Sequence, residues 1–264
     1  MKLDILMSCM HQTDFSLIEK SKIYGNAVII NQCDAADYSE FQTKNGIAKM
    51  YSVRERGLTK SRNMAIDKSN ADICLLCDDD EVFVADYEGK IISAYESLPN
   101  ADIIIFKMQN RAPSFSDKVQ RIRFPKTMKV SSWQISFRRE SLLKSNVRFD
   151  ELLGAGTGNG AEEELKFLQD CIKAKLKIYY VPAEIASVAQ ENSTWFNGYD
   201  EEFFEKRGGT TRYILGWFTA SLYAVYYVVR KRKQYNKNIS FWNALKAIFR
   251  GIKKNNITKQ AKAK

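Results

Sequence analysis

Apolar and polar positions in the first 110 residues alternate in blocks that predict an α/β domain. Four short apolar runs predict buried strands: 3–10, 27–30, 73–77 and 101–108. Three segments between them predict helices: 14–24, 60–68 and 86–98. Strands that alternate with helices in this way form a mostly parallel sheet covered by helices. Ligands of such sheets bind beyond the carboxyl ends of the strands.

The pattern becomes less regular after residue 110. Residues 129–137 have strand character, and 147–149 predict a further short strand. The segment Gly154–Gly160 places a glycine at every second position, which differs from the dinucleotide-binding pattern GxGxxG. It predicts a tightly turned or mobile loop. A helix over 162–175 and a strand over 177–181, closed by Pro182, are expected to follow.

Charge divides the chain into two parts. Residues 206–264 contain 15 Lys or Arg and no Asp or Glu, whereas the other 205 residues carry a net charge of −5. We therefore expect a catalytic domain over 1–205 and a basic tail over 206–264. Such a tail suits an anionic surface, either lipid or nucleic acid. Nucleic acid is the less favoured partner, because the rest of the chain is acidic and contains no recognised nucleic-acid-binding motif.

Two segments of the tail favour attachment to a membrane surface. Residues 213–229 carry no charge, but a helix of this length spans about 25 Å, against about 30 Å for a hydrocarbon core. Residues 239–252 place Trp242, Leu245, Phe249 and Ile252 at helical spacing beside basic residues. This pattern is typical of an amphipathic helix in the interface of an anionic leaflet. A membrane-spanning segment and a tail packed on the catalytic domain are the alternatives.

The scarcity of histidine excludes several kinds of site. His11 is the only histidine, so a zinc finger, an HExxH protease and a multi-histidine metal cage are excluded. The five cysteines are scattered through apolar runs, which disfavours a disulfide framework and fits a reducing cytosol. Cys74 and Cys77 form a CxxC, but residues i and i+3 of a strand face opposite sides, so we expect two core residues. The N-terminal run includes Asp4 and lacks the pattern of a signal peptide.

Three consecutive aspartates, Asp78, Asp79 and Asp80, follow the third predicted strand. Like charges this close repel, so a compensating partner is expected. Hard carboxylate oxygens suit Mg²⁺ or Mn²⁺, and strand alternation would place Asp78 and Asp80 on one side. A solvated turn or a helix N-cap is the alternative.

Three glutamates open the predicted helix after the glycine-rich loop. Carboxylates in a first helical turn favour the helix dipole, which is sufficient to explain them. Glu164, however, shares a face with Leu168 and Cys171, whereas Glu163 points away from that face. An inward carboxylate beside a glycine-rich loop can serve as a general base, so Glu164 is the stronger candidate.

A basic segment, 54–63, precedes the second predicted helix. It reads Arg-Glu-Arg-Gly-Leu-Thr-Lys-Ser-Arg-Asn. Arginines near a glycine turn and a helix start can hold diphosphate oxygens. A solvated basic turn is equally compatible with the segment.

Together these segments resemble the family-2 glycosyltransferases with the GT-A fold. Gly57-Leu-Thr-Lys-Ser-Arg-Asn63, followed by Asp78–Asp80, is similar to that family's GL(S/T)xxRN…DDD region. Phe149-Asp-Glu, Gly154-Ala-Gly and Glu163-Glu164 resemble its acceptor-side loop and its ED motif, and 177–182 resembles the strand that follows. The resemblance covers about residues 1–200. Residues 193–196, with the basic tail, further resemble members that build capsular or other surface polysaccharides.

The resemblance implies an inverting glycosyltransferase that uses a nucleotide-diphosphate sugar and Mn²⁺ or Mg²⁺. The acceptor would be a glycan, expected to be lipid-linked, and the protein would be peripheral or monotopic on the cytoplasmic face of the cell membrane. The implied catalytic residues are Glu164 and Glu163, and the implied metal ligands are Asp80 and Asp78. The implied donor-binding residues are Asn31, Asp34, Arg62, Asn63, Asp78 and Asp79.

Two departures from the family pattern affect the site. Strand two ends in Asn31-Gln32-Cys33-Asp34, where many relatives carry aspartates that hold the base. Residues 187–191 lack the histidine that many relatives use as a metal ligand, which leaves Gln190 or Glu191 as substitutes. A metal-dependent nucleotidyltransferase and a non-catalytic membrane-bound scaffold remain as alternative functions.

Overall fold

The computed structural model describes residues 1–159, 161–188 and 198–263. The chain divides into two compact units. The first unit comprises Met1–Phe149 and Glu164–Glu191, and the second comprises Asp150–Glu163 and Asn192–Lys264. The boundary expected after residue 205 lies inside helix α6 (Glu201–Tyr235), which belongs to the second unit.

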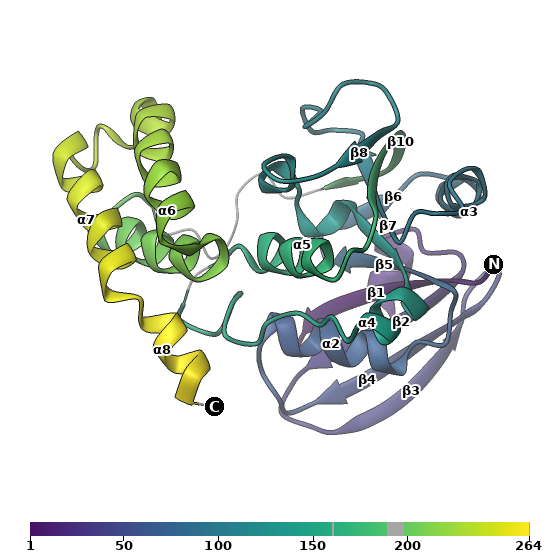
Figure 1. Ribbon diagram of the computed structural model, residues 1–264. Coiled ribbons are helices and arrows are strands. Elements are labelled where there is room, and N and C mark those ends of the chain that lie inside the picture. The colour runs from purple at the N-terminus through teal and green to yellow at the C-terminus, as the bar shows by residue number, and fades with distance from the viewer. Residues whose placement is uncertain (160, 189–197, 264) are drawn as a thin grey trace. The chain divides into compact units, whose positions relative to one another are not determined.

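A ten-stranded sheet forms the centre of the first unit, with the path β3-β4-β2-β1-β5-β9-β7-β10-β6 and β8 paired to β10 (Figure 1). The strands are β1 (Leu3–Met10), β2 (Asn26–Gln32), β3 (Asp37–Gln42), β4 (Ile47–Val53), β5 (Ile73–Asp78), β6 (Glu81–Phe83), β7 (Ile103–Met108), β8 (Gln120–Ile122), β9 (Ile135–Arg138) and β10 (Ile178–Val188). The parallel pairs are β1–β2, β1–β5, β2–β4 and β7–β10. The predicted α/β class with a mostly parallel central sheet is confirmed.

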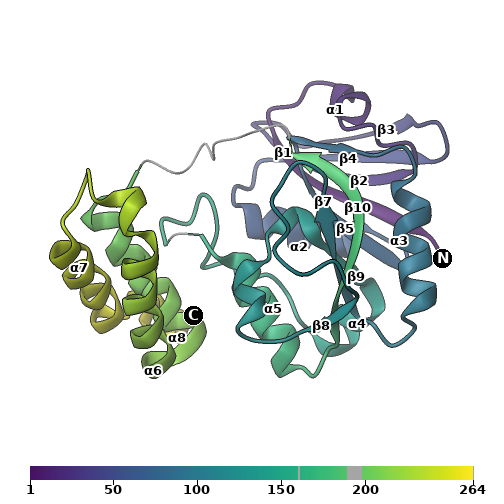
Figure 2. The same cartoon turned by 90° about the horizontal axis from the view of Figure 1, so that it is seen from above.

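Helices cover both faces of this sheet, as Figure 2 shows. They are α1 (Ser16–Lys20), α2 (Leu58–Lys68), α3 (Tyr87–Ser97), α4 (Arg139–Ser145) and α5 (Glu163–Lys173). One core joins α1 and α3 to the sheet, and the other joins α2, α4 and α5. Cys74 lies in one core and Cys77 in the other, so the prediction that they are core residues on opposite faces is confirmed.

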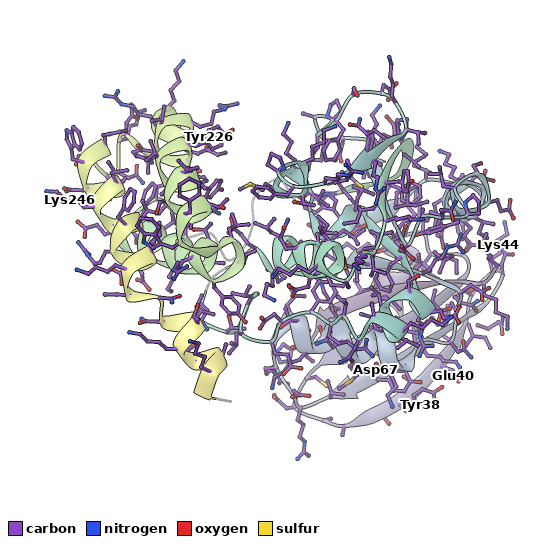
Figure 3. The ribbon with its side chains drawn as sticks, viewed as in Figure 1. Tyr38, Glu40, Lys44, Asp67, Tyr226 and Lys246 are labelled. Atoms are coloured by element: carbon purple, nitrogen blue, oxygen red, sulfur yellow. The ribbon has the colours of Figure 1, made fainter. Side chains whose placement is uncertain are left out.

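Several predicted boundaries are wrong for identifiable reasons. Residues 147–149 form no strand. The stretch 129–137 consists mainly of short 3₁₀ turns, with strand structure only from Ile135. Strand β10 continues past Pro182, because its pairing with β7 shifts register between Val181 and Glu184 and so accommodates a residue without an N–H. Strands β3 and β4 were not predicted; β3 is polar and largely exposed at the sheet edge, where Tyr38 and Glu40 lie (Figure 3).

Helices α6, α7 (Phe241–Lys254) and α8 (Asn256–Ala263) form most of the second unit. Gly216 interrupts α6 with a φ of 77° and a ψ of 172°, so the uncharged stretch 213–229 is not one continuous helix. Among the described residues, no helix combines the length and apolar character needed to span a bilayer. Helix α7 matches the helical pattern predicted over 239–252.

Two glycines let α6 and α7 pack backbone to backbone. A Cβ on Gly251 would lie 1.9 Å from the carbonyl oxygen of Glu205, and a Cβ on Gly208 would lie 2.0 Å from that of Ile248. Ala244, Ala247 and Ile252 are buried along the same side of α7. The contact therefore depends on the absence of side chains at both glycines.

Replacing Gly251 by alanine is expected to destabilise the second unit, because an overpacked contact forces two backbones apart. We expect Gly251→Ala to lower the free energy of unfolding by about 3 kcal/mol. Gly209→Ala is the matched control, since a Cβ there lies 3.9 Å from its nearest neighbour. The control should be neutral or stabilising by up to about 1 kcal/mol. Thermal unfolding measures both, and equal effects would contradict close packing at Gly251.

Candidate active site

The carboxyl ends of four parallel strands, β1, β2, β4 and β5, meet at one edge of the sheet. Asp78 is the last residue of β5 and pairs in register with Ser8 of β1. The chain then turns at Asp79 and Asp80 before β6 begins at Glu81. Alternation would place Asp78 and Asp80 on one side only if the strand continued, and β5 ends at Asp78.

Asp78 is held by two side chains from different elements. Its Oδ1 accepts a hydrogen bond from Arg62 Nη2 at 3.0 Å, and its Oδ2 accepts one from Ser132 Oγ at 3.0 Å. Arg62 is buried, and its guanidinium carbon lies 5.5 Å from the ring centroid of Phe149. Arg62 therefore supplies a positive partner for Asp78, the first of the three aspartates.

Negative charge remains concentrated at the turn. Burial first, and then the charge of Asp78, raise the pKa values of Asp79 and Asp80. Burial and the charge of Asp78 also raise the pKa of Glu81 well above its usual range. Glu81 Oε1 accepts a hydrogen bond from the backbone N–H of Asp78 at 2.8 Å, so Glu81 bridges the two ends of the turn and stabilises it.

Asn63 fixes the segment that precedes the glycine-rich loop. Its side-chain amide bonds both backbone groups of Phe149, accepting from N at 2.8 Å and donating to O at 2.9 Å. Phe149 stacks on Phe167 of α5 with ring centroids 4.3 Å apart. The neighbouring residues Arg62 and Asn63 thus tie α2 to the aspartate turn and to the entry of the loop.

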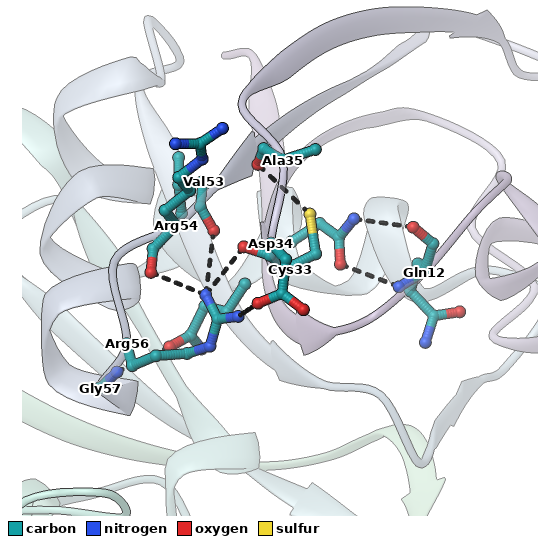
Figure 4. A network of polar contacts seen from close by, with 10 residues as sticks. Gln12, Cys33, Asp34, Ala35, Val53, Arg54, Arg56 and Gly57 are labelled. Atoms are coloured by element: carbon teal, nitrogen blue, oxygen red, sulfur yellow. Dashed lines mark hydrogen bonds and ion pairs between the residues drawn. The ribbon is translucent and has the colours of Figure 1, made fainter.

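A polar network closes the ends of β2 and β4 (Figure 4). Arg56 Nη2 donates to Asp34 Oδ1 at 2.6 Å, and Arg56 Nη1 donates to the carbonyl oxygens of Cys33 and Arg54. Gln32 Oε1 accepts from the N–H of Gly57, whose φ of 127° favours glycine. The sequence pattern pointed to Asp34, whereas it gave no sign that Arg56 is its partner.

Asn31, one of the predicted donor-binding residues, is fully buried. Its side-chain amide accepts from the N–H of Gln12 at 2.9 Å and donates to the carbonyl of Gln12 and to Ser52 Oγ. The side-chain amide of Asn31 is therefore already hydrogen-bonded within the protein, chiefly to the turn that follows β1. Asp34, by contrast, keeps an exposed carboxylate while it pairs with Arg56.

The two candidate bases differ in burial, and in the opposite sense to the prediction. Glu163 is only 5% exposed, whereas Glu164 is partly exposed. Helical spacing directs Glu163 away from the apolar face of the helix, but Glu163 is the first residue of α5 and is nevertheless buried. Glu164 belongs to the first unit with Asp78–Asp80, and Glu163 to the second.

The loop that leads to these glutamates is fastened to α6 inside the second unit. Glu162 forms a buried ion pair with Arg207, whose guanidinium lies over the rings of Phe203 and Tyr227. Glu162 has a φ of 81°, a conformation that costs a non-glycine residue energy and requires support.

Two further contacts hold the same loop. Tyr213 Oη donates to Asp150 Oδ2 at 2.5 Å, and Thr210 Oγ1 donates to the carbonyl oxygen of Asn159 at 2.9 Å. Gly154 and Gly158 adopt positive φ, as expected for a tightly turned loop. Both ends of the loop are therefore held by residues that a sequence pattern would assign to a separate tail.

A pocket of about 210 Å³ lies in the first unit beside the end of β7. Its lining includes Lys107, Arg111, Trp133 and Tyr180. The guanidinium of Arg111 lies 5.6 Å from the ring centroid of Trp133. The positive charge of Arg111 also acts on Asp80, where it opposes the rise in pKa.

No protein-family profile and no curated protein sequence matches this chain. Solved structures do match its fold. Staphylococcus aureus TarS 1–349 in complex with UDP-GlcNAc aligns with a TM-score of 0.60 at 14% identity, covering 90% of this chain and 74% of that one. TarS 1–349 without a named ligand aligns with a TM-score of 0.58 at 14% identity, over 96% and 81% of the two chains. The TarS complex with UDP aligns with a TM-score of 0.56 at 16% identity, covering 90% of this chain and 74% of that one.

These likenesses confirm the predicted fold class. The structure brings Arg62, Asn63 and Asp78 together, and it places Asp79 and Asp80 in the adjoining turn. It sets Asn31 and Asp34 at the end of β2, one buried and one exposed. The candidate ligands Gln190 and Glu191 and the segment 193–196 lie outside the described residues. Ser132 and Arg56 were not predicted, since each acts through contacts distant in sequence.

Asp80→Asn is expected to stabilise the metal-free protein. Burial raises the pKa of the Asp80 carboxyl in the folded protein above its value in the unfolded chain. Below the unfolded-state pKa the group is protonated in both states and does not affect the free energy of unfolding. As pH rises through the folded-state pKa, the group ionises and lowers the free energy of unfolding. At pH 7 in EDTA the substitution should therefore raise Tm, on the order of 2 °C. The gain should vanish near pH 3, where both states are protonated. Differential scanning calorimetry at the two pH values measures it, and a lower Tm at pH 7 would contradict the charge assignment.

Arg207→Met is expected to release the glycine-rich loop while α6 stays folded. The substitution keeps an apolar stem but leaves the buried carboxylate of Glu162 unpaired, at a cost of about 3–5 kcal/mol. Limited proteolysis should then cut within 150–163 faster than in the native protein. Arg207→Met combined with Glu162→Gln should recover much of the protection, because no buried charge remains. Equal cleavage of all three proteins would show that the pair does not hold the loop.

Proposed function

We propose that this protein is a glycosyltransferase that uses a nucleotide-diphosphate sugar as donor. The observation that carries the proposal is Asp78, held by buried Arg62 at the carboxyl end of β5 and followed by a turn with two more aspartates. The fold is shared with TarS, whose structures contain UDP-GlcNAc and UDP. A UDP-sugar, with UDP-GlcNAc first, is accordingly the donor to test.

The end of β2 is the proposed contact for the nucleotide base. Asp34 is exposed there and oriented by Arg56, whereas the amide of Asn31 is already bonded within the protein. We assign Asn31 a supporting role in that contact. Asp78 is the proposed contact for the donor ribose or for a metal-bound water, with Arg62 and Asn63 holding the surrounding segments.

The aspartate turn fits a divalent cation. Asp80 is the proposed direct ligand; burial, with the charge of Asp78 second, raises the pKa values of Asp79 and Asp80, and a cation would offset both effects. Mg²⁺ and Mn²⁺ suit few carboxylates combined with substrate phosphates. Among the described residues there is no ready-made group of three or more His, Cys, Asp or Glu ligands. When bound, such an ion would neutralise charge on the leaving diphosphate.

Glu164 is the proposed general base of an inverting displacement. The acceptor hydroxyl must lose a proton as its oxygen bonds to the anomeric carbon, and the diphosphate leaves with the bonding electrons. Glu164 is partly exposed and can receive that proton, whereas Glu163 is nearly inaccessible. The acceptor is proposed to be a glycan, in the lipid-linked form used for surface polysaccharides.

Donor binding tests the proposed function directly. A thermal-shift screen of nucleotide sugars with and without Mn²⁺ should show one nucleotide series that stabilises the protein, because the ligand binds only the folded state. Slow hydrolysis of the same nucleotide sugar would support a transferase. Release of pyrophosphate from a nucleoside triphosphate would favour a nucleotidyltransferase. Binding of neither class would favour a non-catalytic scaffold.

Glu164→Gln separates chemistry from binding. The substitution keeps size and hydrogen bonding but removes basicity, so turnover should fall at least ~100-fold. Donor and metal affinity should stay within about twofold of the native values, because the substitution leaves the aspartate turn unchanged. Glu163→Gln is the neighbouring control. If Glu163→Gln is inactive and Glu164→Gln active, Glu163 is the base; native rates in both would exclude this acid–base mechanism.

A further inference from the structure

The second half of α6 exposes a continuous row of large apolar side chains. Phe218 is 68% exposed, Leu222 60% and Val229 58%, with Val225 between them. These positions follow the spacing i, i+4, i+7, i+11, which places them on one face of the helix. Trp217 and Tyr226 are each 60% exposed and border the row, and Tyr226 is labelled in Figure 3. We name these six residues the α6 apolar face.

The opposite side of the same helix is already packed. Ala220, Ala224, Tyr227 and Val228 are buried in the core that α6 shares with α7. The exposed face of α6 is therefore distinct from the side of α6 that packs against α7. Large apolar residues gathered on one exposed side of a helix mark an interaction site more often than scattered ones do.

Basic residues continue directly from this face. Arg230, Arg232 and Lys233 are exposed within the turn that follows Val229, and Lys237 lies just beyond the helix end. No acidic residue occurs anywhere after Glu205. A helix with aromatic and aliphatic residues on one side and a basic cluster at its end suits the boundary of an anionic lipid layer.

We propose that the α6 apolar face docks on an anionic lipid bilayer, with residues 217–233 lying in the plane of the interface. Trp217 and Tyr226 provide amphipathic rings of the kind that gather at the headgroup level. The apolar row enters the acyl boundary, and the arginines and lysines contact anionic headgroups. The break at Gly216 ends the preceding helix segment, so the docking segment takes its own direction.

This surface differs from the one expected from sequence. The pattern favoured α7, with Trp242, Leu245, Phe249 and Ile252 as its apolar side. In the structure Ile252 is buried against α6, and Leu245 packs on the same core. Trp242 remains exposed and provides a matched control, because it is a large aromatic residue on the neighbouring helix.

Vesicle sedimentation with the full chain tests the proposal. Native protein should bind vesicles that contain 30% phosphatidylglycerol in phosphatidylcholine, at about 150 mM salt, and bind pure phosphatidylcholine far less. Phe218→Ser with Leu222→Ser should weaken binding to the anionic vesicles at least ~30-fold, because two side chains no longer enter the acyl boundary. Arg230→Gln, Arg232→Gln and Lys233→Gln together should weaken it roughly 100-fold. Trp242→Ser should change it less than about threefold.

Three results would overturn the proposal. The first is native vesicle binding by the Phe218→Ser, Leu222→Ser variant, with circular dichroism and Tm confirming that it is folded. The second is loss of binding in Trp242→Ser alone, which would assign docking to α7. The third is a native dimer that the double variant converts to a monomer without any effect on vesicles, which would make the face a contact between copies of this chain. Donor hydrolysis should be the same in all variants, so a missing transferase activity would not be mistaken for failed docking.

Discussion

The ion pair between buried Arg62 and Asp78 organises the candidate site. Three aspartates at the end of an apolar strand repel one another, and only a positive group from another element can offset them within the sheet edge. Arg62 does so from α2, at 3.0 Å, with its side chain almost fully removed from water. Removing the carboxylate of Asp78 would leave the buried guanidinium of Arg62 unpaired, at a cost of about 3–5 kcal/mol. The geometry of Asp79 and Asp80 therefore depends on the position of α2.

The residue after Arg62 extends this control to the loop. Asn63 binds both backbone groups of Phe149, and Phe149 stacks on Phe167 of α5. One turn of α2 thus positions both the aspartate turn and the point where the chain enters the glycine-rich loop. The other end of that loop is held by Arg207 through Glu162. Residues of α6 are consequently part of the support for the segment that precedes Glu164.

Charge has two opposite uses in this chain. At the sheet edge three acidic side chains lie close together, and burial first, with the charge of Asp78 second, raises the pKa values of Asp79 and Asp80. In the second unit, basic residues concentrate beside an exposed apolar helix face. The first arrangement suits a cation with a diphosphate, and the second suits anionic headgroups. Both are local accumulations of like charge, which a ligand of opposite charge would relieve.

Local apolar runs and period-two alternation are enough to predict the α/β class, the strand that carries Asp78 and the core positions of Cys74 and Cys77. The sequence also singled out the aspartates, Arg62 and Asn63 as a group. It missed the edge strand β3, which is polar and largely exposed, and its neighbour β4, since neither shows a clean apolar run. Only the tertiary structure decided that Asn31 is committed to Gln12, that Glu163 is the more buried glutamate, and that Arg207 holds Glu162. It also showed that α6 carries a larger exposed apolar face than α7, which buries Ile252 and leaves Trp242 and Phe249 exposed. Helical spacing shows which residues share a side but not which side a neighbouring helix covers.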